Sequence, residues 1–270
     1  MDKDTKLCIS IALKPGITGT ALHNAGYKAL NLNYIYKAFS VRDLEGALQG
    51  VKALGIKGCS VSMPFKEEVL NYLDSVDEAA RRIGSVNTIV NRDGELKGYN
   101  TDITGAKAML KHLKVNSDAS VLLLGAGGVS RAMLCALEQE GFSNLAVTNR
   151  DKTRLEKLNN TFIFNSISWN ERNDYKADLL INATSVGMYP DEKSLPIRYQ
   201  SERNFSAVAD VVVSTQETRL INLFKEEKKL YAPGFIMSLD QALEQFKLYT
   251  GKDGPREVFE KRLKALIKRN

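Results

Sequence analysis

A chain of 270 residues can form one large domain or two modest ones. Its 43% hydrophobic and 26% charged residues are typical of a globular protein, and it has no apolar run of about 18 residues that could cross a membrane. The net charge of +6 could suggest a nucleic-acid partner, but residues 256–269 carry six basic and two acidic side chains, which is +4 of that total. Their apolar residues recur at helical spacing, so we expect an amphipathic terminal helix with a solvated basic face and no nucleic-acid binding.

The cysteines and the first residues bear on metal binding and compartment. Cys8, Cys59 and Cys135 are scattered without Cys-x-x-Cys spacing, and the chain has only 2 histidines, which argues against a metal site. The opening MDKDTK is charged, and no apolar signal segment follows it. These features predict a cytoplasmic protein with reduced thiols, no bound metal and no membrane partner.

In chain order, short apolar runs alternate with helical patterns. The runs predicted as strands are NYIYKAF (33–39), GCSVSM (58–63), SVNTIV (85–90), SVLLLGA (120–126), NLAVTN (144–149), DLLINA (178–183) and AVADVVV (207–213). The helices predicted between them are DLEGALQGVKAL (43–54), EEVLNYL (67–73), VSRAMLCALEQEG (129–141) and TRLINLFKEEKK (218–229). This alternation is typical of α/β folds, in which helices cover parallel sheets.

A break near residues 100–120 separates two halves of the chain. A capping-type Asn-Thr-Asp leads into the helical segment 102–113, and a polar turn follows it. A strand, a glycine-rich turn, a helix and a second strand then begin afresh, as in a nucleotide-binding domain. The helical patterns from residue 238 onward have no strand partner, so their own pattern leaves open which half they cover.

The glycine-rich turn places Gly125, Gly127 and Gly128 between a predicted strand and a predicted helix. Glycine lets the backbone turn tightly and approach a pyrophosphate, whose charge then lies on the helix N-terminus. The full dinucleotide fingerprint has a third small residue where this chain has Ser130, and such turns can also serve packing alone. The strand before the turn and the helix after it favour dinucleotide binding over a purely structural turn.

The segment NRDKTR (149–154) follows the next strand, where a NAD-binding domain carries an acidic residue for the ribose hydroxyls. Here Asn149 stands at the expected end of the strand. Arg150 and Arg154 lie four apart at the expected start of the next helix, so they would share one face. Paired guanidinium groups bind phosphate in fork geometry, which predicts the 2′-phosphate of NADP as their partner. Asp151 either contacts the ribose or caps the helix, and both arginines could instead be solvated surface residues.

Three segments of the first half offer groups for chemistry. Lys66 follows Pro64, which suits the first turn of a helix, and lies near the carboxyl end of a predicted strand. Asn87 belongs to another predicted strand, and residues 100–102 (Asn-Thr-Asp) lead into a helix. Taken singly, each has an ordinary explanation as a solvated lysine, a polar strand residue or a helix cap.

Taken together, the segments SVSMPFK, SVNTI, GYNTD, GAGGVSRA, NRDKTR, NATSVGM and GFIMSLDQA resemble, in order and spacing, those of the shikimate dehydrogenase family over essentially the whole chain. The resemblance implies that Lys66 and Asp102 form the catalytic pair. It implies substrate contacts by Ser62, Asn87 and Gln241. It also implies NADP as the cofactor, held by Gly125, Ala126, Gly127, Gly128, Val129, Asn149, Arg150, Arg154, Thr184 and Gly234.

The same resemblance implies a fold of two α/β domains. Residues 1–103 with about 238–270 would form an N-terminal substrate domain with a mostly parallel sheet. Residues from about 104 to 237 would form a Rossmann-type NADP-binding domain. The active-site cleft would lie between the domains, and the C-terminal helices would return to the first one.

The N-terminal segment departs from the family pattern. In the family, two hydroxyls of a Ser-x-Ser-Pro segment hold the substrate carboxylate, and a histidine follows. Anchored on His23, the two serine positions are Ile17 and Gly19 here, while Thr18 and Thr20 supply hydroxyls out of register. The chain keeps the catalytic pair but has other residues at the positions that hold the substrate carboxylate. In this combination it resembles the shikimate dehydrogenase-like subgroup.

We therefore expect an NADP-dependent oxidoreductase that interconverts shikimate and 3-dehydroshikimate. Its catalytic efficiency should be reduced, because the residues that would hold the substrate carboxylate are altered. A tyrosine that the family usually carries later in the chain is also replaced, by Val213. One alternative is a dehydrogenase of quinate or another cyclic polyol carboxylate. A second is a cofactor-binding sensor of low turnover, against which the catalytic pair argues. The substrate would be a small cyclic hydroxy acid, and the pattern predicts no oligomeric state.

Overall fold

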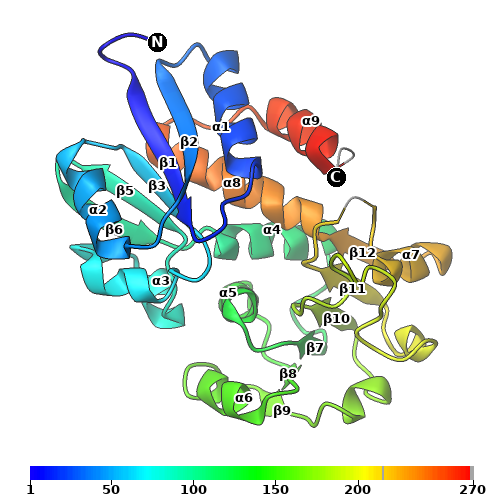
Figure 1. Ribbon diagram of the computed structural model, residues 1–270. Coiled ribbons are helices and arrows are strands. Elements are labelled where there is room, and N and C mark those ends of the chain that lie inside the picture. The colour runs from blue at the N-terminus through cyan, green and yellow to red at the C-terminus, as the bar shows by residue number, and fades with distance from the viewer. Residues whose placement is uncertain (215, 268–270) are drawn as a thin grey trace. The chain divides into compact units, whose positions relative to one another are not determined.

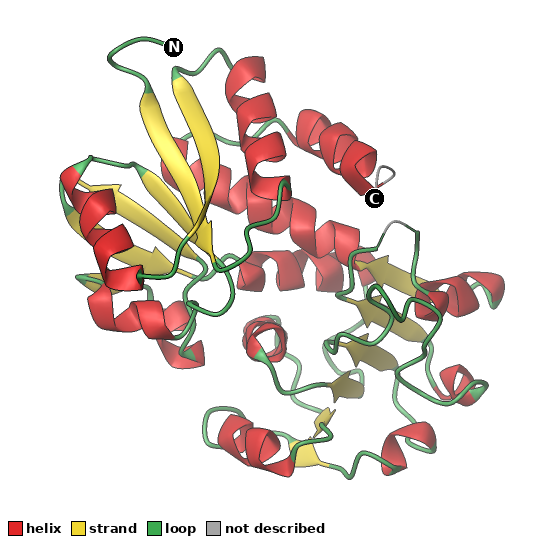
Figure 2. Ribbon diagram, viewed as in Figure 1, coloured by secondary structure: helices red, strands yellow, loops and turns green. Residues whose placement is uncertain are grey.

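The computed structural model describes residues 1–214 and 216–267. Two compact units divide the chain, Met1–Thr101 with Leu239–Leu266 and Asp102–Ser238 (Figure 1). Helix α8 (Gly234–Thr250) begins in the second unit and continues in the first. Over the described residues, no helix combines the length and the apolar character needed to span a bilayer. Each unit contains one sheet with helices against it, which is the α/β class predicted from the alternating pattern (Figure 2).

The first unit contains a mixed six-stranded sheet in the order β2-β1-β3-β5-β6-β4. Its strands are β1 (Lys6–Ala12), β2 (Tyr34–Ser40), β3 (Gly58–Val61), β4 (Ser75–Val76), β5 (Thr88–Arg92) and β6 (Glu95–Tyr99). Strands β2, β1 and β3 are parallel, whereas β5 is antiparallel to both β3 and β6. The β5–β6 hairpin turns at Asp93 and Gly94, which both have positive φ (53° and 95°), as a two-residue Asp-Gly turn requires.

Helices cover both faces of this sheet (Figure 1). Against one face lie α2, the 3₁₀ helix η1 and α3, whose apolar side chains form a core with those of β1, β3, β5 and β6. Against the other lie α1, the first-unit part of α8, and α9, where a Cβ on Gly26 of α1 would meet Phe246 and Phe259. The bounds are α1 (Thr18–Ala29), α2 (Leu44–Ala53), η1 (Glu68–Tyr72), α3 (Glu78–Ile83) and α9 (Arg256–Ile267). The C-terminal helices therefore return to the first unit, as the family resemblance implied.

A buried aromatic cluster joins these helices to β2. The ring of His23 stacks on Tyr36 with 4.6 Å between centroids, and Phe246 and Phe259 also lie against it. The imidazole is completely buried. Burial disfavours the charged ring and lowers the pKa of His23 to about 4.

The second unit contains a six-stranded sheet in the order β12-β11-β10-β7-β8-β9, in which every neighbouring pair is parallel. This is the strand order of the Rossmann fold. The strands are β7 (Val121–Leu124), β8 (Leu145–Thr148), β9 (Asn165–Ser166), β10 (Leu179–Asn182), β11 (Ala207–Asp210) and β12 (Leu230–Pro233). The central strands are buried on both faces, which explains why their sequences are continuous apolar runs.

Helices complete the second unit around this sheet. Those of the α type are α4 (Asp102–Leu113), α5 (Gly128–Gln139), α6 (Lys152–Asn159) and α7 (Arg219–Glu226), and the 3₁₀ helices are η2 (Glu171–Asn173) and η3 (Ser201–Asn204). The apolar side chains of α7 pack on β7, β10 and β11. Helix α4 approaches the start of α8 closely, since a Cβ on Gly105 would lie 2.5 Å from the carbonyl oxygen of Met237.

One local prediction in the first unit is wrong. Pro64 does not occupy the first turn of a helix, because residues 63–67 form turns and the helical segment begins only at Glu68. That segment is a single 3₁₀ helix, η1, rather than the α-helix predicted for residues 67–73. The turn residues instead make the connection from β3 to η1 that carries Lys66.

The buried imidazole predicts an acid-sensitive first unit. The unfolded pKa is 6.5 and the folded pKa is about 4, so the stability from the neutral ring is present above about pH 6.5 and is lost as the pH falls towards 4. By linkage, this one group accounts for about 3 kcal/mol of lost stability between pH 7 and pH 4. We expect the free energy of unfolding to fall by about that much more in the wild type than in His23→Leu, measured by urea titration with circular dichroism. Equal losses in the two proteins would contradict this role of His23.

Candidate active site

The turn between β7 and α5 requires glycine at its first position. Gly125 has φ of +113°, and its N–H donates to the carbonyl oxygen of Thr148 at 2.8 Å. A Cβ there would lie only 2.9 Å from the carbonyl oxygen of Ala183. The positive φ and the close approach of the next strand's loop each exclude a larger residue.

The rest of this turn forms an open cradle at the N-terminus of α5. Gly127 and Gly128 have no other atom within 4 Å of the position a Cβ would take, and both are exposed. Ala126 is buried and Val129 half-buried beside them. The N–H groups at a helix start, with open space in place of the glycine side chains, suit a pyrophosphate. The donor set at this turn therefore fits a dinucleotide.

Ser130, which departs from the fingerprint, contributes to the same turn. It is completely buried, and its Oγ accepts a hydrogen bond from the N–H of Gly127 at 3.2 Å. The same oxygen would lie 3.2 Å from a Cβ on Gly125. The serine thus fixes the turn through its hydroxyl.

The segment after β8 differs in one respect from the prediction. Asn149 follows the strand directly, and its Nδ2 donates to the carbonyl oxygen of Asp151 at 2.9 Å. Asp151 is the N-cap of α6 and accepts from the N–H of Arg154 at 3.2 Å. Arg150 therefore precedes the helix and shares no helical face with Arg154. Arg154 lies 3.4 Å from the Asp151 carboxylate, so its charge is already partly balanced.

A buried carboxylate holds the loop that contains Thr184. Asp210 ends β11, and its carboxylate accepts from Asn182 Nδ2 at 2.9 Å and from Thr218 Oγ1 at 2.6 Å. Asn182 Oδ1 in turn accepts from the Thr184 hydroxyl at 2.7 Å, and that hydroxyl accepts from the N–H of Val186 at 3.1 Å. Burial raises the pKa of Asp210 to about 6, although its hydrogen bonds oppose that rise. The loop after β10 is thus fixed by a polar network that starts on the neighbouring strand.

Gly234 opens α8 at a point where the backbone leaves no room for a side chain. A Cβ there would lie 2.5 Å from the carbonyl oxygen of Val211 and 2.6 Å from that of Val212. Val213, the residue that replaces the family's tyrosine, follows in the same loop and is 36% exposed. The loop after β11 and the start of α8 are therefore in close contact within the second unit.

In the first unit, backbone and side-chain bonds join the segments of Lys66, Asn87 and Thr101. The carbonyl oxygen of Lys66 accepts from the N–H of Val86 at 2.8 Å. Asn87, which is buried, uses its Oδ1 to accept from the N–H of Thr101 at 2.9 Å. Asp102, the first residue of the second unit, follows Thr101 by one peptide bond and is itself buried. Within the first unit, these contacts join the turn that carries Lys66, through residues 86–87, to the segment that ends at Thr101.

The same network extends to α8. Gln245 donates through Nε2 to Thr88 Oγ1 at 2.9 Å, and Thr88 donates to Asn87 Oδ1 at 2.7 Å. Gln241, predicted to contact substrate, lies one helical turn earlier and is half-buried. Ser62 directly follows β3 and is exposed. Of the predicted substrate residues, Ser62 thus follows β3, Asn87 directly precedes β5, and Gln241 lies on α8.

The N-terminal departure has a structural counterpart. Ile17 is the N-cap of α1 and is 63% exposed, and Thr18 is exposed as well. A Cβ on Gly19 would lie 3.0 Å from the hydroxyl oxygen of Tyr36. Thr20 is half-buried one position further along the helix. The phenol of Tyr36 therefore occupies the space into which a serine at position 19 would extend.

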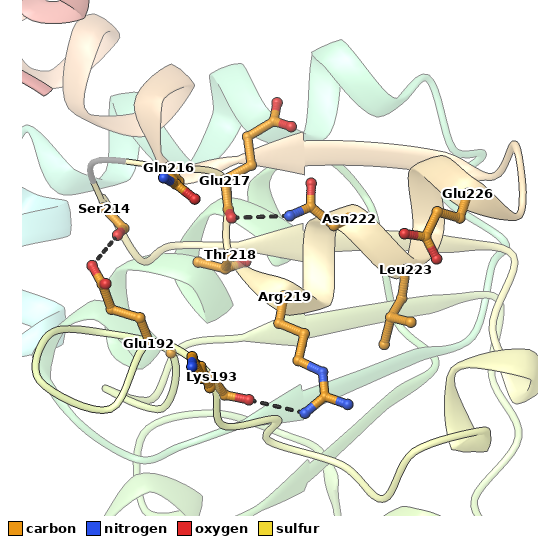
Figure 3. Close-up of a pocket in the computed structure, with 11 residues that line it drawn as sticks. Glu192, Lys193, Ser214, Gln216, Glu217, Thr218, Arg219, Asn222, Leu223 and Glu226 are labelled. Carbon is orange, nitrogen blue, oxygen red and sulfur yellow. Dashed lines mark hydrogen bonds between the residues drawn. The ribbon is translucent and has the colours of Figure 1, made fainter. Parts of the chain in front are cut away.

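The second unit also has a cavity that contains none of the predicted site residues. Its volume is about 470 Å³, and it lies over the N-terminus of α7. Figure 3 shows Ser214 bonded to Glu192 on one side and Arg219 bonded to the carbonyl oxygen of Lys193 below. Its lining mixes acidic and basic groups. Separately, no cluster of three or more potential metal ligands occurs within residues 1–214 and 216–267.

Sequence reasoning missed Asp210 and Thr218. A signal for the first was present, because an acidic residue directly ending a buried apolar strand lies at the carboxyl edge of the sheet, where ligands bind in open α/β folds. Thr218 offered only the ordinary signature of a helix cap, and its Oγ1 indeed accepts from the N–H of Ile221. Its bond to the carboxylate depends on a contact that the local pattern does not encode.

Family models match both parts of this chain. Residues 18–89 match the shikimate dehydrogenase substrate binding domain, and residues 106–221 match the shikimate / quinate 5-dehydrogenase model. A shikimate dehydrogenase-like protein of Haemophilus influenzae is 38% identical over 252 residues, covering 93% of this chain and 92% of the relative. A shikimate dehydrogenase (NADP(+)) of Caldanaerobacter subterraneus is also 38% identical, covering 89% of this chain and 90% of its own.

Solved structures agree with these relatives. A shikimate 5-dehydrogenase-like protein superposes with a TM-score of 0.93 at 37% identity, covering 100% of both chains. The shikimate 5-dehydrogenase of Thermus thermophilus, in complex with NADP(H) and shikimate, superposes with a TM-score of 0.85 at 28% identity, covering 96% of this chain and 99% of its own. With matched models in both parts and relatives along most of its length, this chain belongs to the shikimate dehydrogenase family of oxidoreductases.

Proposed function

We propose that this protein is an NADP-dependent oxidoreductase that interconverts shikimate and 3-dehydroshikimate. The observation that carries the proposal is the bonding of Val86 to Lys66 and of Asn87 to Thr101, which joins the segment of the basic group to that of the acidic group. Relatives that match over most of the chain are named as NADP-dependent shikimate dehydrogenases. The fingerprint turn and the open cradle before α5 supply a matching dinucleotide site.

Lys66 and Asp102 take the catalytic roles. Oxidation of a secondary alcohol removes a hydride from carbon and a proton from oxygen, and an alkoxide is too basic to form unaided. Lys66 accepts that proton as a neutral amine when the alcohol is oxidised, and as the resulting ammonium it returns the proton when the ketone is reduced. Asp102 orients the substrate hydroxyl and the Lys66 side-chain nitrogen, so that the proton moves along one fixed hydrogen bond.

The cofactor residues divide by the part of the dinucleotide they meet. When bound, NADP supplies the hydride acceptor. Gly125, Ala126, Gly127, Gly128 and Val129 hold the pyrophosphate, and Asn149, Arg150 and Arg154 hold the adenosine ribose with its 2′-phosphate. The network of Asp210 positions the Thr184 loop, and Gly234, which is packed against the backbone of Val211 and Val212, would lie on the nicotinamide side.

Ser62, Asn87 and Gln241 contact the substrate ring. The hydroxyl of Thr18 or Thr20 binds the substrate carboxylate, since Ile17 and Gly19 provide no hydroxyl. A carboxylate held in this way leaves the reacting carbon less well placed, so we expect a lower efficiency than an intact serine pair would give. No observation favours quinate or a sensor role over shikimate turnover. The three free cysteines, all buried, fit an enzyme of the reducing cytoplasm.

Replacement of the base tests the reaction. We expect Lys66→Ala to lower kcat by about 10²–10⁴, the usual effect of a lost general acid or base, with little change in NADPH affinity. Asp102→Asn should also lose rate and bind shikimate more weakly. The matched control is Lys3→Ala, an exposed lysine near the N-terminus. Near-normal turnover by Lys66→Ala in a steady-state assay would exclude this role for the lysine.

Replacement of the first arginine tests the cofactor. We expect Arg150→Ala to weaken NADP binding by roughly 10- to 150-fold, because a hydrogen bond to a charged group contributes about 1.5–3 kcal/mol. NAD lacks the 2′-phosphate, so its affinity should change little. Calorimetric titration of both cofactors measures the difference. A similar loss for NAD would show that Arg150 supports the fold of the site and does not read the phosphate.

The half-buried threonine is the better candidate for the substrate carboxylate. We expect Thr20→Val to raise the KM for shikimate by about 10-fold, the effect of losing one hydrogen bond to a carboxylate. NADP affinity should stay the same. Thr18→Val, at an exposed position two residues earlier, is the matched comparison. If both variants keep the wild-type KM, neither hydroxyl holds the carboxylate.

A further inference from the structure

Arg172 lies at the same sheet edge as Arg150. Strand β9 pairs in parallel with β8, with Ala146 opposite Asn165 and Val147 opposite Ser166. The carboxyl ends of parallel neighbours lie at one edge, which is the ligand-binding edge in open α/β sheets. Arg150 follows β8 by two residues, and the 3₁₀ helix η2 that carries Arg172 follows β9. Two arginines 22 positions apart in the chain therefore come from adjacent strand ends.

The guanidinium of Arg172 is held in one orientation. It stacks on the indole of Trp169, 3.9 Å from the ring centroid. Its Nε donates to the carbonyl oxygen of Pro196 at 2.8 Å, and its Nη1 donates to that of Trp169. A guanidinium has five N–H donors, so three remain for a further partner. A fork that is already oriented loses little conformational entropy when it binds a planar or tetrahedral anion.

Positive charges surround this guanidinium without a counter-charge. Burial first, then the charges of Arg198 and Arg150, lower the pKa of Arg172. Arg198 is fixed nearby, because its N–H donates to Asn173 Oδ1 at 2.7 Å. Within residues 1–214 and 216–267, none of these three arginines forms an ion pair, and the neighbouring carboxylate of Glu171 accepts from the N–H of Ser168. Like charges so arranged repel one another until an anion is bound.

Arg154 contrasts with Arg172. It is paired with Asp151, and its side chain is 69% exposed. An exposed guanidinium that is already paired with a carboxylate contributes less to phosphate binding than one that is held in a fixed orientation and has no ion-pair partner. Among the arginines near Arg150, Arg172 is thus the better prepared for an anion.

We propose that Arg172 is a further specificity-determining residue of the cofactor site, binding the 2′-phosphate of NADP together with Arg150. The inference rests on the proposed function, because it assumes that this site takes NADP. A phosphate dianion suits two neighbouring guanidinium groups better than a carboxylate does, since it offers more oxygens and more charge.

The test uses two small probes that differ only in the 2′-phosphate, adenosine 2′,5′-bisphosphate and adenosine 5′-monophosphate. Their affinities are measured by calorimetry for the wild type, Arg150→Ala, Arg172→Ala and Arg172→Lys. Arg203→Ala serves as the matched control, because Arg203 is an exposed arginine of the same unit, near Glu227. Trp169 is the only tryptophan of the chain, so its fluorescence reports on this site directly.

We expect Arg172→Ala to weaken the bisphosphate by about 10-fold or more and the monophosphate by less than about 2-fold. Arg172→Lys, which keeps the charge and loses the fork, should lie between. The bisphosphate should change the emission of Trp169 in the wild type, and the change should shrink in Arg172→Lys.

Each of the following results would overturn the assignment of Arg172. Equal weakening of both probes would make it a support of the adenosine pocket, and unchanged affinities would remove it from the site. If discrimination is lost in Arg150→Ala alone, the proposed cofactor stands and the inference about Arg172 fails. A wild type that does not distinguish the probes would overturn both.

Discussion

The buried amide oxygen of Asn87 is the contact on which the arrangement of the strand ends in the first unit depends. It accepts from the N–H of Thr101 at 2.9 Å, from the Thr101 hydroxyl at 3.2 Å and from the Thr88 hydroxyl at 2.7 Å. Without it, a buried backbone N–H directly before Asp102 would lose its partner, at a cost of about 1–3 kcal/mol. Because β5 is antiparallel to β3, the same strand end also lies beside the turn that carries Lys66. A single polar side chain directly before β5 thus connects the sheet to the segments predicted to be catalytic.

In the second unit, a buried carboxylate, that of Asp210, holds the loops at the strand ends in place. Asp210 is buried at the end of β11, where desolvation disfavours ionisation, and two side-chain donors and one backbone donor compensate in part. Its partners lie on β10 and at the cap of α7, so one carboxylate fixes two loops at the ligand edge of the sheet. An apolar residue could fill the same volume but could not orient Asn182. Precision at this edge is therefore obtained through a group that costs stability unless all its bonds are made.

The sequence predicted the elements that have a signature in their own residues. The parallel strands of the second unit are continuous apolar runs, and the turn at Gly125 needs glycine because of its positive φ, so both could be predicted from the sequence. Asp151 caps α6, which was one of the two roles considered for it, and this cap places Arg150 before the helix and not in its first turn as predicted. The relation of Arg150 to Arg172 depends on the pairing of β8 with β9, a strand of two residues with no apolar pattern. Contacts of that kind arise only after folding, so no local pattern could indicate them.

At Gly19, the difference from the family sequence is accompanied by close packing of Tyr36 against this position. If the missing serine left empty space, placing a serine at position 19 would restore the predicted hydrogen bond to the substrate carboxylate. Here the hydroxyl of Tyr36 lies 3.0 Å from the position of the missing Cβ, closer than most real contacts, and Tyr36 is itself clamped by its stack on His23. A serine at position 19 therefore requires Tyr36 to shift by a few tenths of an ångström, and Tyr36 is packed in the buried aromatic cluster beside α1. The residue at position 19 and the packing of this core are consequently coupled, so a substitution at position 19 acts on the aromatic cluster as well as on the N-terminal segment.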